Sequence, residues 1–275
     1  IRRRGWFNLM RRRQGGWAMP RRPEAPRPMT YAEKIIARVS EGRPVRPGDA
    51  VFAKADWRYA HEYSSPLGIS ALEREMGANA QLADPPTIIF FSDHLTFIER
   101  AMPAERKKIG MLDLAQALAK VQQRFCEQHG LKLHGFLKDR EGSEGISHSI
   151  MAERYIRPGQ LAIGTDSHTL HCGALGAFAF GVGSTDMACA WLTGEIRIQV
   201  PKTCRVRLDG KLQPGVEAKD VVLHLLRLPY IREGHAIGQA FEYTGDVVTA
   251  LSTDERATLT NMVAEIGGFT GIVVP

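Results

Sequence analysis

Residues 164–186 read GTDSHTLHCGALGAFAFGVGSTD, and the two halves of this stretch differ in chemistry. The first half places a carboxylate, a hydroxyl and an imidazole side by side on Asp166, Ser167 and His168, whereas the second is almost entirely Gly, Ala and Phe. Glycine costs about 1 kcal/mol relative to alanine inside a helix. We therefore expect these glycines to let two backbones approach closely, or to leave a helix N-terminus open to an anion. The stretch is either a reactive cluster at the mouth of a fold or a polar turn before a tightly packed helix.

The segments around this stretch alternate between strand and helix patterns. Residues 86–91 (PTIIFF) form a continuous apolar run, as a buried strand does, and residues 109–129 repeat apolar positions with helical spacing before Gly130. Further candidates are strands at residues 131–137 and 160–164 and a helix at residues 30–39. This order predicts an α/β fold in which helices flank a mostly parallel sheet.

The pattern changes after Cys204. Residues 204–212 alternate around Asp209 and Gly210, which predicts a hairpin. Residues 252–255 (STDE) form a capping box that opens a helix ending at Ile266. We also expect a helix at residues 218–228 and strands at residues 240–243 and 270–274. We place a domain boundary near residue 200, with one domain over residues 29–200 and a second, incomplete one over residues 201–275.

The composition is that of a globular protein, with 44% hydrophobic and 24% charged residues among 275. No apolar run reaches the roughly 18 residues of a membrane helix. The net charge is +6, but residues 1–28 carry nine arginines and one acid, which leaves −2 for the remainder. A nucleic-acid-binding domain would carry its basic face on the fold, so nucleic acid is not the expected partner. We interpret residues 1–28 as a disordered basic leader, partly upstream translated sequence, because the chain begins with Ile1 and Met29 precedes the first helical pattern.

The four cysteines are Cys126, Cys172, Cys189 and Cys204, and no two of them form a Cys-x-x-Cys pair. Their spacing indicates neither a disulfide framework nor a zinc site. Reduced thiols in a cytoplasmic protein are the expected state.

Two predicted strands end in similar polar clusters. Asp93 and His94 follow residues 86–91, and Asp166 to His168 follow residues 160–164. Ligands bind beyond the carboxyl ends of parallel strands, and a carboxylate beside an imidazole serves as acid, base or metal ligand. Either cluster alone is also typical of a turn, since Asp and Ser favour turns.

Other candidates are less specific. His148, in GISHSIM, is either a site residue or a structural histidine. Asn261 and Glu265 lie four residues apart on one helix face and are either site residues or solvated. A divalent metal could be held by a set of carboxylate and imidazole side chains, namely Asp93, His94, His148, Asp166 and His168. Neither a dinucleotide fingerprint nor a P-loop occurs in the glycine-rich stretch.

Several motifs together resemble the aconitase superfamily. They are TDSHT with GALGAFAFGVGSTDMA, VPKTCRVRLDGKLQPGVEAKDVVLHLL, AHEYSSPL (60–67), SDH (92–94), GISH (145–148) and TNMVAEIGGFTGIVVP (260–275). The resemblance covers roughly residues 30–275 and is nearest to the branch of isopropylmalate dehydratase large subunits and homoaconitase-like proteins. It implies three-layer α/β/α domains, and it makes the glycine-rich segment the close-packed helical floor of a site.

The resemblance also implies a chemistry. The family dehydrates and rehydrates hydroxy di- and tricarboxylic acids with a [4Fe–4S] cluster whose one open iron acts as a Lewis acid. By resemblance, Asp93 and His94 help to protonate the departing hydroxyl. Asp166 and His168 line the cluster and substrate, together with Thr165, Ser167 and Asn261. His148 forms hydrogen bonds near them, with Glu265 as its acidic partner or as a contact to iron-bound solvent.

Three features of this sequence differ from the family pattern and limit which family properties can be inferred for it. The cluster cysteines of the family lie C-terminal to the matching part, and none of the four cysteines here corresponds to them. The family's serine base lies on a swivelling domain or a small subunit, which is also absent. Leu67 stands where aconitases have a substrate-binding glutamine. We therefore expect an N-terminal portion of a large subunit, inactive alone, that pairs with a small subunit as a heterodimer or heterotetramer.

The substrate and two alternative functions stay open at this point. Isopropylmalate, which would indicate leucine biosynthesis, homocitrate, methylmalate-type acids and citrate are all compatible with these motifs. One alternative is a non-catalytic RNA-binding relative that uses the arginine-rich leader. The other is a mononuclear metal hydrolase that uses the same histidines and carboxylates.

Overall fold

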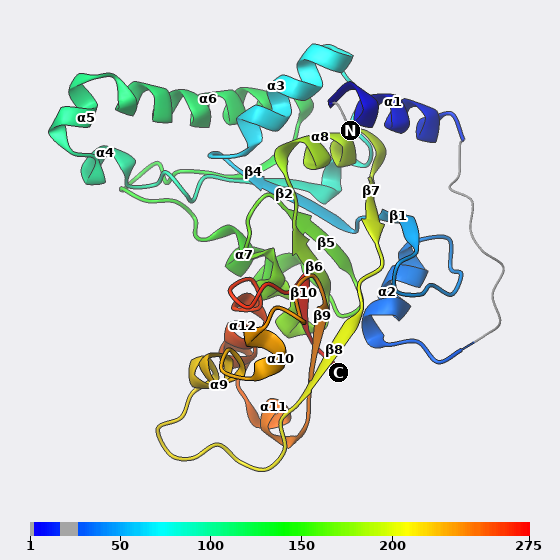
Figure 1. Ribbon diagram of the computed structural model, residues 1–275. Coiled ribbons are helices and arrows are strands. Elements are labelled where there is room, and N and C mark those ends of the chain that lie inside the picture. The colour runs from blue at the N-terminus through cyan, green and yellow to red at the C-terminus, as the bar shows by residue number, and fades with distance from the viewer. Residues whose placement is uncertain (1–2, 17–26) are drawn as a thin grey trace.

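The structure is a computed structural model that describes residues 3–16 and 27–275 (Figure 1). A five-stranded parallel sheet has the order β4-β3-β2-β5-β6, and a three-stranded parallel sheet has the order β10-β9-β8. The strands β1 and β7 form a separate antiparallel pair. The prediction of an α/β fold with a mostly parallel sheet flanked by helices is confirmed.

The strands are β1 Ala50–Lys54, β2 Trp57–His61, β3 Ile88–Phe91, β4 Lys132–His134, β5 Leu161–Gly164, β6 Phe178–Gly181, β7 Glu195–Gln199, β8 Thr203–Arg207, β9 Ala240–Thr244 and β10 Thr270–Val273. The α-helices are α1 Arg3–Gln14, α2 Tyr31–Val39, α3 Ser65–Met76, α4 Ile98–Ala101, α5 Ala104–Lys108, α6 Met111–His129, α7 Ser147–Ile150, α8 Ser184–Thr193, α9 Ala218–Leu225, α10 Pro229–Arg232, α11 Asp246–Ala250 and α12 Thr253–Asn261. Shorter turns of helix are η1 Pro85–Thr87, η2 Met151–Tyr155 and η3 Thr169–Leu175.

The main core lies between the five-stranded sheet and the helices α3, α6 and α8, which Figure 1 shows grouped on one side of it. All four residues of β3 and of β5 are buried, as expected for parallel strands covered on both faces. Phe90 of β3 packs against Trp191 of α8 and Phe125 of α6. The predicted helix stop at Gly130 is confirmed, since this residue adopts φ +63°.

The helical prediction for the second half of the glycine-rich stretch is wrong. Residues 169–175 form the short helix η3, and the chain then turns at Gly176 (φ +75°) into the strand β6. Phe178, Ala179 and Phe180 are buried in β6, which pairs with β5 in parallel. This run of small and aromatic residues therefore forms a strand at the edge of the sheet and not a helix.

The predicted hairpin at Asp209 and Gly210 is also wrong. Gly210 does adopt a turn conformation (φ +90°), but β8 pairs with β9 in parallel. The chain after Gly210 runs into a loop and α9 and does not return beside β8. The capping box at Ser252 is confirmed, because the Glu255 amide donates to its hydroxyl at 3.2 Å. That helix ends at Asn261, earlier than expected, and turns follow as far as Gly267.

The prediction of a disordered leader is wrong for residues 3–14, which form α1. Phe7 and Met10, three positions apart on this helix, are buried in the main core, where α1 packs against α8. Arg13 donates to both carboxylate oxygens of Glu195, at 2.7 and 2.9 Å. Apolar burial and this ion pair order the segment. The rest of the leader prediction, at residues 1–2 and 17–26, lies outside the described residues.

The division into two domains near residue 200 stays a prediction. The three-stranded sheet is built from residues 203–273, and a second core cluster gathers around it. Within the part of the chain that the structure describes, none of the helices combines the length and apolar character needed to cross a bilayer.

The expected close approach of backbones at the glycine-rich stretch is confirmed at Gly173. A Cβ atom there would lie 1.7 Å from the carbonyl oxygen of Gly271 in β10. Gly173→Ala should therefore lower the free energy of unfolding by about 3 kcal/mol or prevent folding, because neither backbone can move independently. Urea denaturation measures this, and Gly135→Ala is the control, since its Cβ would meet its nearest neighbour at 3.7 Å. Equal effects of the two changes would contradict the close approach.

Candidate functional site

Three adjacent strands of the five-stranded sheet end in residues with titratable side chains. His61 closes β2 and is followed by Glu62, Asp93 and His94 follow β3, and Asp166 follows β5. Because β3, β2 and β5 are neighbours and parallel, their carboxyl ends meet at one edge of the sheet. The side chains that follow them form the candidate site.

Asp93 and His94 form the first carboxylate–imidazole pair. His94 Nδ1 lies 2.7 Å from Asp93 Oδ1, and the amide of Ser147 donates to Asp93 Oδ2 at 2.7 Å. Burial alone would raise the pKa of Asp93, but the hydrogen bonds from His94 and Ser147 outweigh it and lower that pKa. The hydrogen bond with Asp93 raises the pKa of His94, whose side chain is 38% exposed. The pair is therefore a buried carboxylate that holds a partly exposed, basic imidazole.

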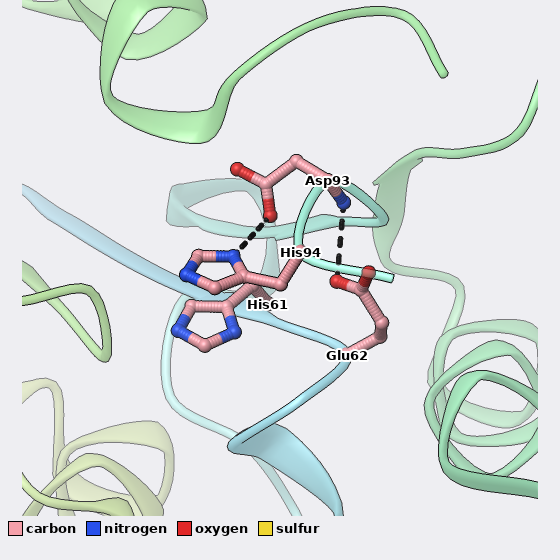
Figure 2. A group of neighbouring side chains, drawn as sticks. All are labelled: His61, Glu62, Asp93 and His94. Carbon is pink, nitrogen blue, oxygen red and sulfur yellow. Dashed lines mark hydrogen bonds and ion pairs between the residues drawn. The ribbon is translucent and has the colours of Figure 1, made fainter. Parts of the chain in front are cut away.

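Glu62 and His61 complete this corner of the site (Figure 2), and neither was singled out from the sequence. The carboxylate of Glu62 accepts hydrogen bonds from the amides of Asp93 at 3.1 Å and Leu95 at 2.5 Å. The ring of His61 is stacked on that of His94, with centroids 3.6 Å apart and an interplanar angle of 11°. The usable signal was an imidazole and a carboxylate side by side in AHEYSSPL, as at the other strand ends.

Asp166 is the centre of the second pair. Its Oδ2 lies 2.6 Å from His148 Nδ1 and 3.3 Å from the hydroxyl of Ser147, and its Oδ1 accepts the amide of His168 at 2.9 Å. Burial would raise the pKa of Asp166, but these hydrogen bonds, with that of His148 the largest, lower it well below the usual range. Asp166 is therefore a permanent anion that fixes His148.

Ser147 joins the two pairs. Its amide binds Asp93 and its hydroxyl binds Asp166, and the residue is fully buried at the first turn of α7. The carboxylates of Asp93 and Asp166 therefore both bind Ser147. Ser147 belongs to the GISH motif but was not singled out, because a serine beside a candidate histidine gives no signal of its own.

The third pair links residues that follow elements of the two different sheets. His168 Nε2 lies 2.9 Å from Glu265 Oε1, and His168 Nδ1 lies 3.1 Å from the hydroxyl of Ser167. Glu265 follows α12, on the chain segment that leads to β10. The structure thus pairs Glu265 with His168 and not with His148, whereas the second role that the resemblance implied, a contact to iron-bound solvent, stays a prediction.

Thr165 and Asn261 have different surroundings. Thr165 Oγ1 accepts hydrogen bonds from the amide of His61 at 3.3 Å and the hydroxyl of Ser64 at 2.6 Å, so it links the ends of β2 and β5. Asn261 Nδ2 lies 3.5 Å from His171 Nδ1. His171 is a further histidine that sequence reasoning missed, and its ring lies 4.9 Å from that of His148. Burial, and then His148, lower the pKa of His171 to about 4.

The metal-ligand set expected from the sequence does not come together as one group. Among the described residues, the cluster with ligand atoms within 4.8 Å of one another is His61, Glu62, Asp93 and His94. His148, Asp166 and His168 are not in it. Each carboxylate oxygen of Glu62 and Asp93 already accepts a hydrogen bond. Within this group Asp93 binds His94, Glu62 binds the backbone amides of Asp93 and Leu95, and His61 stacks on His94.

The cysteines do not fit an iron–sulfur cluster. All four lie within the described residues: Cys126, Cys172 and Cys189 are buried in the core and Cys204 is half-buried. Burial raises the pKa of Cys126, Cys172 and Cys189 to about 12, and among the described residues none of the four cysteines belongs to a group of side chains close enough to share a metal ion. The chain therefore lacks a ligand set for the cluster that the resemblance implies.

The fold and site define an α/β protein that presents acid–base pairs at the carboxyl edge of a parallel sheet. Residues 33–275 match the aconitase family (aconitate hydratase), and the chain belongs to that family. It is 37% identical over 248 residues to the 3-isopropylmalate dehydratase large subunit 1 of Pyrococcus furiosus, covering 90% of this chain and 54% of that protein.

Two further relatives show the same coverage. The 3-isopropylmalate dehydratase large subunit of Aquifex aeolicus is 37% identical over 248 residues, covering 90% of this chain and 52% of that protein. The chloroplastic large subunit of Arabidopsis thaliana is 34% identical over 254 residues, covering 90% of this chain and 47% of that protein. The chain spans about half the length of the curated relatives it matches.

The protonation of His61 gives a prediction about pH. Burial, and then His94, lower the pKa of His61 to about 4, whereas the unfolded chain binds this proton near pH 6.5. Stability that depends on neutral His61 is therefore present above pH 6.5 and is lost as the pH falls towards 4. Between pH 7.5 and 5 this residue should account for a loss of about 2 kcal/mol in the free energy of unfolding.

Urea denaturation of His61→Asn at both pH values checks this. The variant should lose about 2 kcal/mol less than the wild type between pH 7.5 and 5. His235→Asn is the control, since that side chain is 61% exposed. An acid-induced loss in His61→Asn as large as that of the wild type would contradict the prediction.

Proposed function

We propose that this chain supplies acid–base groups to the active site of a hydro-lyase that acts on a hydroxy di- or tricarboxylic acid. The observation that carries the proposal is the convergence of the pairs Asp93–His94, Asp166–His148 and His168–Glu265 at the edge of one sheet. The printed names of the relatives support the more specific proposal of a 3-isopropylmalate dehydratase large subunit, in leucine biosynthesis.

His94 is the proposed acid. Removal of a hydroxyl group as water requires a proton on the departing oxygen. His94 Nδ1 is held by Asp93, so Nε2 is the atom left to carry a proton to that oxygen. The pKa of His94 is raised by Asp93, which keeps more of the imidazolium form near neutral pH. Transfer of this proton leaves a neutral imidazole that Asp93 still orients.

The other two pairs orient their imidazoles. Asp166 stays ionised and binds Nδ1 of His148, which leaves Nε2 of that ring for the reacting groups. Glu265 binds Nε2 of His168 from the other sheet. We propose that Thr165, Ser167 and Asn261 line the site beside them.

The remaining parts of the active site would come from other polypeptide. We propose that the thiolates for a [4Fe–4S] cluster lie outside residues 1–275, and that a small subunit completes the site in a heterodimer or heterotetramer. A cytoplasmic location is proposed from the four free thiols.

The RNA-binding alternative is not proposed, because Arg13 of the leader pairs with Glu195 and the helix packs on the core. Metal hydrolysis is not proposed, because the expected ligand set does not assemble.

Purified residues 1–275 should show no turnover of isopropylmalate after treatment with iron and sulfide, because the chain lacks a thiolate ligand set. A rise in ultraviolet absorbance as the unsaturated product forms would report turnover, and iron and sulfide analysis reports whether a cluster is bound. Turnover by this chain alone would overturn the proposal that the site is incomplete. Zinc near one equivalent without sulfide would favour the hydrolase.

In the complete large subunit with its small-subunit partner, His94→Asn should lower kcat about 100-fold or more, because the leaving hydroxyl loses its proton donor. His235→Asn, which removes an exposed imidazole in the turn after α10, is the matched control. Steady-state kinetics on isopropylmalate, homocitrate, methylmalate and citrate would identify the substrate in the same assay. Unchanged kcat in His94→Asn would remove His94 from the mechanism.

A further inference from the structure

The stacked rings of His61 and His94 come from segments far apart in the sequence and meet face to face (Figure 2). His61 is the last residue of β2 and is 3% exposed, whereas His94 lies in the loop after β3. One ring is thus part of the sheet and the other part of a loop. The ring of His61, which belongs to the sheet, is held in place independently of the loop that carries His94.

His61 is held by contacts that do not involve His94. Its amide donates to Thr165 Oγ1 at 3.3 Å, and its Nε2 lies 3.3 Å from the hydroxyl of Ser64. Ser64 in turn donates its proton to Thr165 Oγ1 at 2.6 Å. With the Ser64 proton directed to Thr165, the Ser64 oxygen is available to accept a proton from His61 Nε2.

This proton arrangement leaves Nδ1 of His61 with a lone pair. Among the described residues, Nδ1 is buried and has no hydrogen-bond partner. A ring with one proton on Nε2 and a free lone pair on Nδ1 is neutral. A neutral aromatic face attracts a neighbouring imidazolium and does not repel it.

The next residue fixes the backbone under His94. Glu62 accepts the amides of Asp93 and Leu95, which flank His94 on both sides. His61 covers one face of the His94 ring, and Asp93 binds its Nδ1. These contacts hold the main chain of His94, one face of its ring and its Nδ1 atom. The Nε2 atom of His94 has no hydrogen-bond partner among the described residues.

We propose that His61 is a positioning residue for His94. Its ring provides the flat surface against which His94 lies with Nδ1 on Asp93 and Nε2 directed away from that carboxylate. The role depends on the shape and neutrality of the ring, since neither of its nitrogens binds His94: Nε2 contacts Ser64, and Nδ1 has no hydrogen-bond partner among the described residues. The effect on turnover rests on the proposed function, whereas the effect on the geometry of His94 does not.

The geometric effect is tested on residues 1–275 by NMR with ¹⁵N-labelled histidine, with His94 assigned through His94→Gln. In the wild type, neutral His94 should carry its proton on Nδ1, with a downfield proton signal from the hydrogen bond to Asp93. His61→Leu removes the flat face and should shift His94 towards a mixture of tautomers and weaken that signal. His61→Phe retains the face and should preserve both. His61→Asn is a second variant without a ring, should His61→Leu fail to fold.

The outcomes separate stacking from simple packing. Circular dichroism and thermal unfolding establish that each variant is folded. A folded variant without the ring whose His94 signals match the wild type would overturn the proposal. Equal loss of the signals in His61→Phe would also overturn it, because the ring face would then not be what matters.

The effect on turnover is tested in the complete enzyme. His61→Leu should lower kcat about tenfold or more while KM changes little, since a displaced donor affects the chemical step, and His61→Phe should restore most of kcat. A wild-type enzyme without hydro-lyase activity would refute the proposed function but leave the NMR test decisive. Unchanged kcat in His61→Leu, in an active enzyme, would overturn the role of His61 in catalysis.

Discussion

The close approach of Gly173 in η3 to Gly271 in β10 packs the three-stranded sheet against the segment between β5 and β6, and the candidate site depends on it. Only residues without a Cβ atom permit this approach, since a Cβ on Gly271 would also meet the backbone of Thr260 at 2.9 Å. Thr270 Oγ1 donates to the carbonyl of Ala179 at 2.7 Å across the same contact. With the sheets at this separation, Glu265 reaches His168 from the far side. If the two sheets lay farther apart, the hydrogen bond between His168 and Glu265 could not form.

Among the described residues, hydrogen bonds stabilise the buried carboxylates of Asp93 and Asp166, and no arginine pairs with them. Asp93 accepts from His94 and Ser147, and Asp166 accepts from His148, Ser147 and His168. Burying such groups is costly unless every oxygen is satisfied. Because each of these hydrogen bonds also fixes an imidazole or its backbone, the network that stabilises the anions also orients the rings.

Local sequence patterns were sufficient for part of this structure. The strand-end rule located Asp93, His94 and Asp166, and the capping box located the start of α12. Glu265 and Asn261 were placed in the site only through the family resemblance. His61 and Glu62 were missed because β2 was not recognised as a strand. Its Arg58 is buried, with hydrogen bonds to the carbonyls of Ala190 and Ala83, residues far away in the sequence.

The same limit explains the errors at β6 and β8. Whether a short apolar segment becomes a strand depends on the strand that lies beside it. β6 forms as a strand because it pairs with β5. β8 pairs with β9, more than thirty residues later, instead of with the segment after Gly210. Neither partner can be identified from a local window of sequence, because the pairing is decided by tertiary packing.

Three histidines at the site, His61, His94 and His171, differ in environment. His61 and His171 have pKa values lowered to about 4, chiefly by burial, and they stay neutral at physiological pH. His94 has its pKa raised by Asp93 and is partly exposed. Environments that separate the pKa values of like groups assign them different roles. His94 is therefore the ring in this corner suited to carry a proton to a substrate, and the neutral ring of His61 against it removes one source of repulsion when that proton is present.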